Sequence, residues 1–179
     1  MNNQLLEQAF AAKGRGDEDA DEKLYEECIA SDPRDAEALR ELGLMHYGRH
    51  KNNLKAKELI ERSLVIEDCP QGRFYLALVL AELGLTNDAE QEFKQALERS
   101  ENDALVDAMY ADFLASNERL DEAEEHFKAA LLKEPDCEYA LKNYPKLRAF
   151  RARDRELDRI AKTPEDVEES TRTDMGTGS

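Results

Sequence analysis

Hydrophobic residues recur along most of the chain with the spacing of amphipathic helices rather than of strands. Leu76, Leu80 and Leu83 follow one another in steps of three or four residues. In the next predicted helix, Ala89 and Phe93 are again four residues apart. This spacing places apolar side chains on one face of a helix. No run shows the alternation of a half-buried strand bounded by turns. The pattern predicts an all-α chain.

The predicted helices come in pairs that repeat along the chain. Short polar segments separate the two helices of a pair, and Pro33, Pro70 and Pro135 stand near the ends of units. Two sets of equivalent positions recur with a period of about 34 residues. The small positions are Ala9, Gly43, Ala77 and Ala111, and the large positions are Tyr25, Ile60, Phe93 and Phe127. The period predicts four helical hairpins, at residues 2–35, 36–69, 70–103 and 104–137.

The hairpins carry the marks of a known repeat. Gly43 and Tyr47 stand in the first helix of the second pair, and Ala123 and Phe127 stand in the second helix of the fourth pair, with Pro135 after it. This pattern resembles the tetratricopeptide repeat. The resemblance implies an α-solenoid of about four helix–turn–helix units that stack into a right-handed superhelix. Such a protein is expected to be a scaffold and not an enzyme.

The first unit departs furthest from the family pattern. Asp21 stands where the later units have Ala56, Ala89 and Ala123, at a position where a small residue lets two helices approach. We therefore expect this unit to be looser than the others or to serve as an N-terminal cap. Cys28 takes a small-residue position of the same helix and is expected to be a packed core residue.

Residues 138–162 are expected to form a C-terminal capping helix region. Pro145 is expected to interrupt the first part of it, because proline lacks a backbone donor and clashes with the preceding helical turn. Leu147 and Phe150 begin an apolar stripe in the second part, residues 146–162, which has seven basic and three acidic residues. Residues 163–179 hold five acidic residues and one Arg, and are expected to be disordered.

Composition and charge narrow the classes of protein. The chain has 41 acidic and 25 basic residues and a formal net charge of −16, which makes nucleic acid an unlikely partner. Its longest apolar run, residues 75–81, is too short to span a membrane. Three widely spaced Cys form no disulfide framework, and the N-terminus resembles no signal peptide. These features predict a cytoplasmic protein.

The resemblance implies a partner-binding groove on the concave face, which the first helices of the units line. The positions that it assigns to the groove are Leu6, Phe10, Arg40, Leu44, Tyr47, Phe74, Leu78 and Leu105. Most are apolar, and an apolar face of this size is typical of an interface. We expect a peptide or helix of a partner protein to bind there, with Arg40 fixing its orientation. The alternative is that the C-terminal helix covers this face.

Two further functions stay open. Exposed repeat ends could pair two copies into a homo-oligomer, and the basic segment 146–162 could bind RNA. An enzyme is disfavoured because the sequence has no phosphate-binding Gly-rich loop and no nucleophile motif. No cofactor is expected. No metal site is expected either, because His46 and His50 lack a third ligand nearby.

Overall fold

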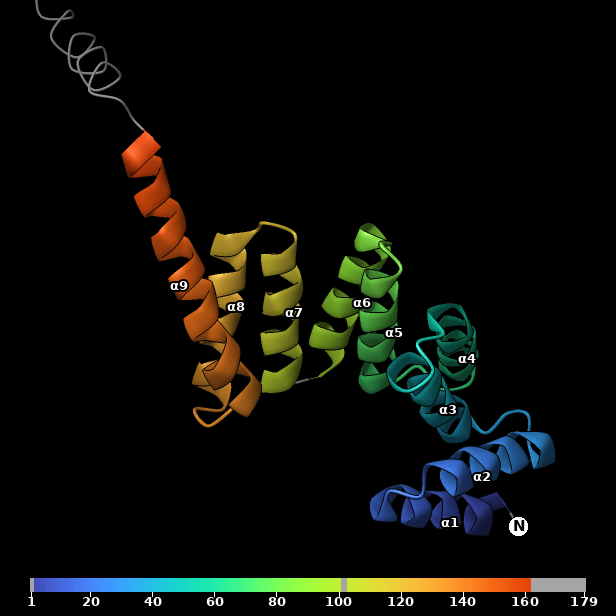
Figure 1. Cartoon of the computed structure of the whole chain (residues 1–179). Coiled ribbons are helices and arrows are strands. Elements are labelled where there is room, and N and C mark those ends of the chain that lie inside the picture. The colour runs from blue at the N-terminus through green and yellow to red at the C-terminus, as the bar shows by residue number, and fades with distance from the viewer. Residues whose placement is uncertain (1, 101–102, 162–179) are drawn as a thin grey trace, which may run out of the picture. The chain divides into compact units, whose positions relative to one another are not determined.

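The computed structural model describes residues 2–100 and 103–161, and all regular secondary structure in these ranges is helical (Figure 1). The helices are α1 (Asn2–Arg15), α2 (Glu18–Ser31), α3 (Ala36–Gly48), α4 (Asn53–Ile66), α5 (Pro70–Glu82), α6 (Thr86–Arg99), α7 (Ala104–Ser116), α8 (Leu120–Lys133) and α9 (Glu138–Ala161). The chain divides into two compact units, residues 1–106 and 107–179. Each is described by itself.

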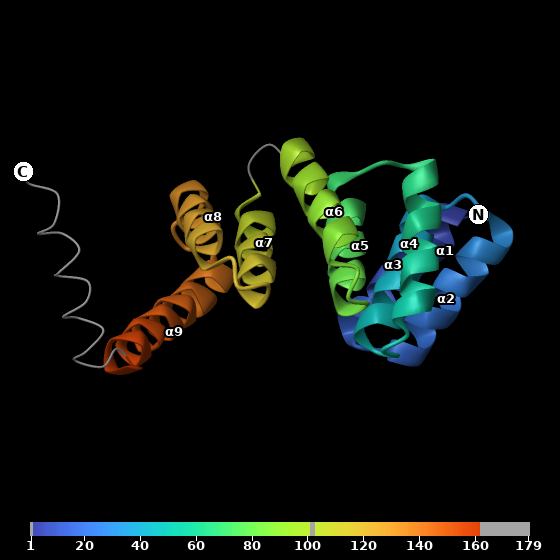
Figure 2. The same ribbon diagram turned by 90° about the horizontal axis from the view of Figure 1, so that it is seen from above.

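The first unit contains three helical hairpins, α1–α2, α3–α4 and α5–α6, and α2 also packs on α3 and α4 on α5 (Figure 2). The small repeat positions allow the close approach within a hairpin. A Cβ atom added to Gly43 would lie 2.8 Å from Cγ1 of Ile60 and 3.3 Å from the carbonyl oxygen of Ala56. The large positions Tyr25, Ile60 and Phe93 are completely buried. The pattern of small and large residues thus builds the core.

Polar side chains cap the N-termini of several of these helices. Side-chain oxygens of Asp35 and Asn52 accept the N–H groups of Ala38 and Lys55, at 2.9 and 3.1 Å. Such caps satisfy backbone donors that a helix leaves unpaired at its N-terminus. In α5 the cap is Cys69, whose sulfur lies 3.4 Å from the backbone nitrogen of Gly72. These caps fix where α3, α4 and α5 begin.

The core of the first two hairpins forms around Tyr25 and Cys28 of α2. Ala9, Leu39, Leu42, Met45 and Leu59 are among the buried residues of the same cluster. Cys28 is fully buried, as expected from its place in the repeat. Burial raises the pKa of its thiol, and Asp35 and Glu27 add to the effect. Asp21 is fully buried too, although it replaces the small residue of the pattern.

The second unit places α7, α8 and α9 together. The ring of Phe127 in α8 stacks on Tyr144 in α9, with centroids 5.7 Å apart. Asp107 at the start of α7 is buried, and its carboxylate contacts His126 Nδ1 at 3.0 Å and Lys133 Nζ at 2.5 Å. Burial raises the pKa of Asp107, but the hydrogen bonds from α8 outweigh it and leave this pKa below the ordinary value.

The predicted interruption at Pro145 is wrong, because α9 continues through it as one helix of 24 residues. Pro145 lies on the exposed side of the helix, so the carbonyl that loses its partner can bond to water. Tyr144, just before the proline, stacks on Phe127 of α8, and Leu147, just after it, is buried. Tertiary contacts therefore override the local preference. Residues 163–179, expected to be disordered, lie outside the described residues.

Candidate protein-binding surface

The predicted groove residues all lie in the first helices of hairpins. Leu6 and Phe10 are in α1, Arg40, Leu44 and Tyr47 in α3, Phe74 and Leu78 in α5, and Leu105 in the first turn of α7. In these helices the repeat leaves one side free of the hairpin partner. Their exposures differ, and this difference decides which of them could touch a partner.

Most of the predicted positions on α1, α3 and α5 are accessible. Phe10 is 37% exposed, and its ring meets Tyr25 edge-on with centroids 6.0 Å apart. Leu44, Tyr47 and Leu78 are half-buried. Burial raises the pKa of Tyr47, with a contribution from Glu82 of α5. We call Leu6, Phe10, Leu44, Tyr47 and Leu78 the first-helix face. Leu105, 43% exposed, lies in the first turn of α7 and lines a pocket of about 300 Å³ together with Phe74 of α5.

Two predicted groove residues, Arg40 and Phe74, are buried. Arg40 is 8% exposed, and its guanidinium lies 3.6 Å from the sulfur of Cys69 and 3.7 Å from a carboxylate oxygen of Glu37. Its Nε atom is buried without a hydrogen-bond partner. Phe74 is 6% exposed and packs edge-on against Phe93. Both side chains therefore lie in the interior, beneath the exposed residues of α3 and α5.

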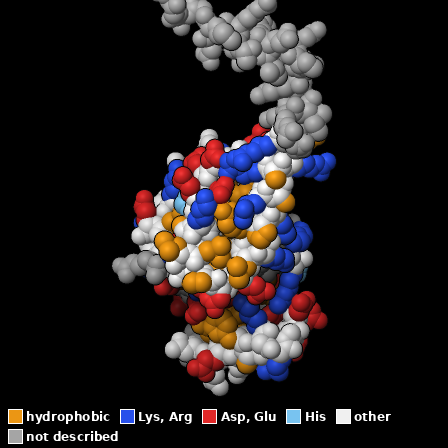
Figure 3. Space-filling view, turned by 90° about the vertical axis from the view of Figure 1, so that its left-hand side faces the viewer, with side chains coloured by type: hydrophobic (Ala, Val, Ile, Leu, Met, Phe, Trp, Pro, Cys, Tyr) orange, Lys and Arg blue, Asp and Glu red, His pale blue; other side chains and the backbone are white. Residues whose placement is uncertain are grey.

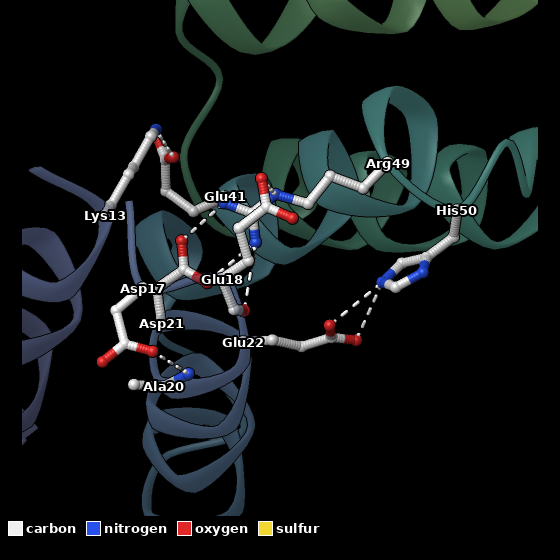
Figure 4. Close-up of polar contacts among 9 residues, drawn as sticks. All are labelled: Lys13, Asp17, Glu18, Ala20, Asp21, Glu22, Glu41, Arg49 and His50. Carbon is white, nitrogen blue, oxygen red and sulfur yellow. Dashed lines mark hydrogen bonds and ion pairs between the residues drawn. The ribbon is translucent and has the colours of Figure 1, made fainter. Parts of the chain in front are cut away.

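Sequence reasoning missed a polar junction between the first two hairpins (Figure 4). Arg49, the C-cap of α3, donates two hydrogen bonds to the buried carboxylate of Asp21, at 2.8 and 2.7 Å. It also donates to the carbonyl oxygen of Glu18 at 3.2 Å, and His50 lies 3.0 Å from Glu22. The hydrogen bonds from Arg49 lower the pKa of Asp21. An acidic residue at a small-residue position was the available signal.

Sequence reasoning also missed an apolar pocket of about 230 Å³ between α7, α8 and α9. Its lining residues are Asp112, Ala115, Leu120, Phe127, Asn143, Lys146, Leu147 and Phe150. Only part of the apolar stripe expected in residues 146–162 is buried. Leu147 is buried, whereas Phe150 and Leu157 are 58% and 54% exposed. We call this pocket, together with the exposed Phe150 beside it, the α9 groove.

Neither a metal site nor a membrane span is found within the described ranges. No three His, Cys, Asp or Glu side chains there are grouped as ligands would be. The rings of His46 and His50 lie 5.1 Å apart without a third ligand. The described helices are also too short or too polar to cross a membrane.

Comparison with known proteins agrees with the fold. The chain is similar to YrrB, "a TPR protein with an unusual peptide-binding site", at 21% identity over 83% of this chain and 76% of that one, with a TM-score of 0.64. It is similar to MamA at 16% identity over 99% and 98% of the chains, with a TM-score of 0.69. A chain of the APC/C hetero-tetramer Cut9–Hcn1 gives 17% identity and a TM-score of 0.76, over 82% of this chain but only 30% of that one.

These likenesses define an all-α helical-repeat protein of the α-solenoid class, as predicted from the sequence. Residues 80–143 match the sequence model of the tetratricopeptide repeat family. The stretch matched begins in α5 and ends in α9. Among curated proteins, none matches the sequence.

Proposed function

We propose that the protein is a non-enzymatic scaffold that binds a peptide or helix of a partner protein on the first-helix face. The observation that carries this proposal is the set of apolar side chains that α1, α3 and α5 leave accessible, with the aromatic residues Phe10 and Tyr47 among them. Clustered exposed apolar residues of this kind are typical of interfaces. The peptide-binding site named for the similar protein YrrB points in the same direction.

The division of roles within the face follows from burial. Phe10 and Tyr47 are accessible aromatic side chains, and aromatic residues contribute most to the affinity of such interfaces. Arg40 and Phe74 are buried, so they position α3 and α5 rather than contact a partner first. Leu44 and Leu78 are half-buried and add apolar contact area.

Self-association is a second candidate, favoured by the exposed apolar side chains of α9. Phe150 and Leu157 lie in α9, the last of the described helices, and are 58% and 54% exposed there. A second copy could cover them, which would make the protein a homo-oligomer. Sedimentation velocity over a wide range of protein concentration tests this candidate, and a constant mass would refute it.

The partner proposal is tested by affinity capture with two matched variants of the full chain. The binding-face variant is Phe10→Ser with Tyr47→Ser. The control is Leu54→Ser with Val65→Ser, which removes two apolar side chains of α4 that are 73% and 88% exposed. Circular dichroism should show unchanged helix content in both.

The proposal predicts a protein that co-purifies with the wild type and the control but is depleted at least about tenfold with the binding-face variant, since losing an aromatic anchor typically costs more than about 1.4 kcal/mol. Equal capture by all three proteins would refute a role for the first-helix face. Loss from both variants would show that the effect does not depend on this face.

A further inference from the structure

The α9 groove is an apolar site that the described part of the chain leaves open. It is lined by the buried Phe127 of α8, and by the buried Leu147 and the exposed Phe150 of α9. Ala115 of α7 and Leu120 of α8 complete the apolar lining. Because burying such side chains is favourable by about 25 cal/mol per Å², an occupant with an apolar side chain would be stabilised there.

The helix that forms this groove is also the basic part of an acidic protein. α9 has seven basic and four acidic residues, whereas the whole chain carries −16. Figure 3 views the molecule from the side on which α9 is drawn and shows hydrophobic side chains among both basic and acidic ones. An occupant that complements this helix is therefore acidic.

Several positive charges of α9 are available for such an occupant. Arg151 is not, because it bonds to Glu124 and Asp121 of α8. Arg153 and Arg155 are exposed, and Arg155 lines a small polar pocket with Glu118, Leu120, Asp121, Arg151 and Asp154. Lys146 lines the apolar pocket itself. Apolar surface and exposed positive charge thus adjoin one another on one helix.

We propose that residues 163–179, the segment that follows α9, occupy the α9 groove within the same molecule. This segment carries five acidic residues and one Arg. Four of the acidic residues, Glu165, Asp166, Glu168 and Glu169, flank Val167 directly. The segment therefore pairs an apolar side chain for the pocket with carboxylates for the exposed arginines.

The lengths of chain agree with this assignment. Phe150 lies 11 residues before Ala161, the last residue of α9, which corresponds to about 17 Å along a helix. Val167 follows Ala161 by six residues, and six extended residues span up to about 20 Å. A chain that turns back after α9 brings Val167 to Phe150 and its acidic neighbours beside Arg153 and Arg155. Because the segment is tethered, its effective concentration is of millimolar order, so even a weak contact is populated.

The test compares backbone amide spectra of isotope-labelled full chains. One variant neutralises the segment (Glu165→Gln, Asp166→Asn, Glu168→Gln and Glu169→Gln), and a second, Val167→Asp, keeps it acidic but removes the apolar side chain. The control neutralises four exposed glutamates far along the chain (Glu7→Gln, Glu26→Gln, Glu27→Gln and Glu98→Gln). All variants leave α9 and its contacts unchanged.

We expect the amide resonances of Lys146, Leu147 and Phe150 to shift in both segment variants and to stay in place in the control. Raising the salt concentration from about 0.05 M to about 0.5 M should move the wild-type resonances toward those of the neutralised variant, because exposed ion pairs are screened. Groove resonances that do not respond to either segment variant would overturn the proposal. Groove resonances that respond to protein concentration instead would assign the groove to a second copy and overturn it too.

Discussion

The ion pair between Asp21 and Arg49 should behave asymmetrically when either partner is removed. The Asp21 side chain is completely buried, whereas the Arg49 side chain is 27% exposed. Removing one partner of a buried ion pair typically costs about 3–5 kcal/mol, because the other charge stays buried and uncompensated. Arg49→Ala leaves a buried carboxylate, although water can enter where the guanidinium lay. We therefore expect a loss of about 2–3 kcal/mol in the free energy of unfolding.

Asp21→Ala leaves a guanidinium that can turn into solvent. It also places Ala where the other units of this protein have Ala56, Ala89 and Ala123. The lost hydrogen bonds cost about 1–2 kcal/mol, and the better helix propensity of Ala returns about 0.5 kcal/mol. The expected net loss is about 1 kcal/mol. The double variant should lie close to Asp21→Ala alone, which gives a coupling energy of about 2–3 kcal/mol.

Urea unfolding followed by circular dichroism measures the free energy of unfolding of the wild type, the two single variants and the double variant. Hydrogen exchange of α1 and α2 locates the effect in the first hairpin. The pKa of Asp21 is lowered in the folded state, so the pair stabilises the protein above the unfolded pKa and loses its effect as the pH falls through the folded pKa. The difference between wild type and Arg49→Ala should therefore shrink below about pH 4. An Arg49→Ala variant that is no less stable than Asp21→Ala would refute the reasoning.

Three further predictions concern packing, a second buried carboxylate and thiol reactivity. Gly43→Ala should destabilise the protein by about 1–3 kcal/mol in urea unfolding because the added methyl group has no room, whereas Gly48→Ala, with nothing within 4 Å, should stabilise it by up to about 1 kcal/mol. Asp107→Asn should lower the free energy of unfolding by about 1–3 kcal/mol at neutral pH. Because the pKa of Asp107 is lowered in the folded state, this loss should shrink below about pH 4. Urea unfolding repeated across pH measures it. Maleimide labelling followed by mass spectrometry should modify the half-buried Cys69 before the fully buried Cys28, and equal rates would contradict the burial order.

The repeat pattern predicted the core well because a helical hairpin is a local structure. The small residues that let helices approach and the large residues beside them recur at a fixed spacing, so Ala77 and Phe93 could be assigned to the core from the sequence. Pro145 could not be judged in the same way. Its local effect is destabilising, and only the stacking of Tyr144 on Phe127 and the burial of Leu147 show why the helix continues.

The candidate site was harder to predict because helical register gives the side of a helix but not the depth of a side chain. Arg40 and Phe74 were assigned to the groove by the same register as Tyr47, yet both are buried. The α9 groove was missed for a related reason. Its lining comes from three helices, and no single segment contains enough of it to be recognised.

The charged side chains of this protein include buried and exposed groups, and salt should affect the two kinds differently. Asp21 and Asp107 are buried carboxylates that each bond to a side chain from a neighbouring helix, so they belong to the packing of the hairpins. Arg153 and Arg155 of α9 are exposed, and their attraction to acidic residues falls steeply with ionic strength. Moderate salt should therefore leave the helical hairpins folded while it weakens any acidic occupant of the α9 groove. A partner that competes for that groove would then bind more tightly to the neutralised segment variant than to the wild type.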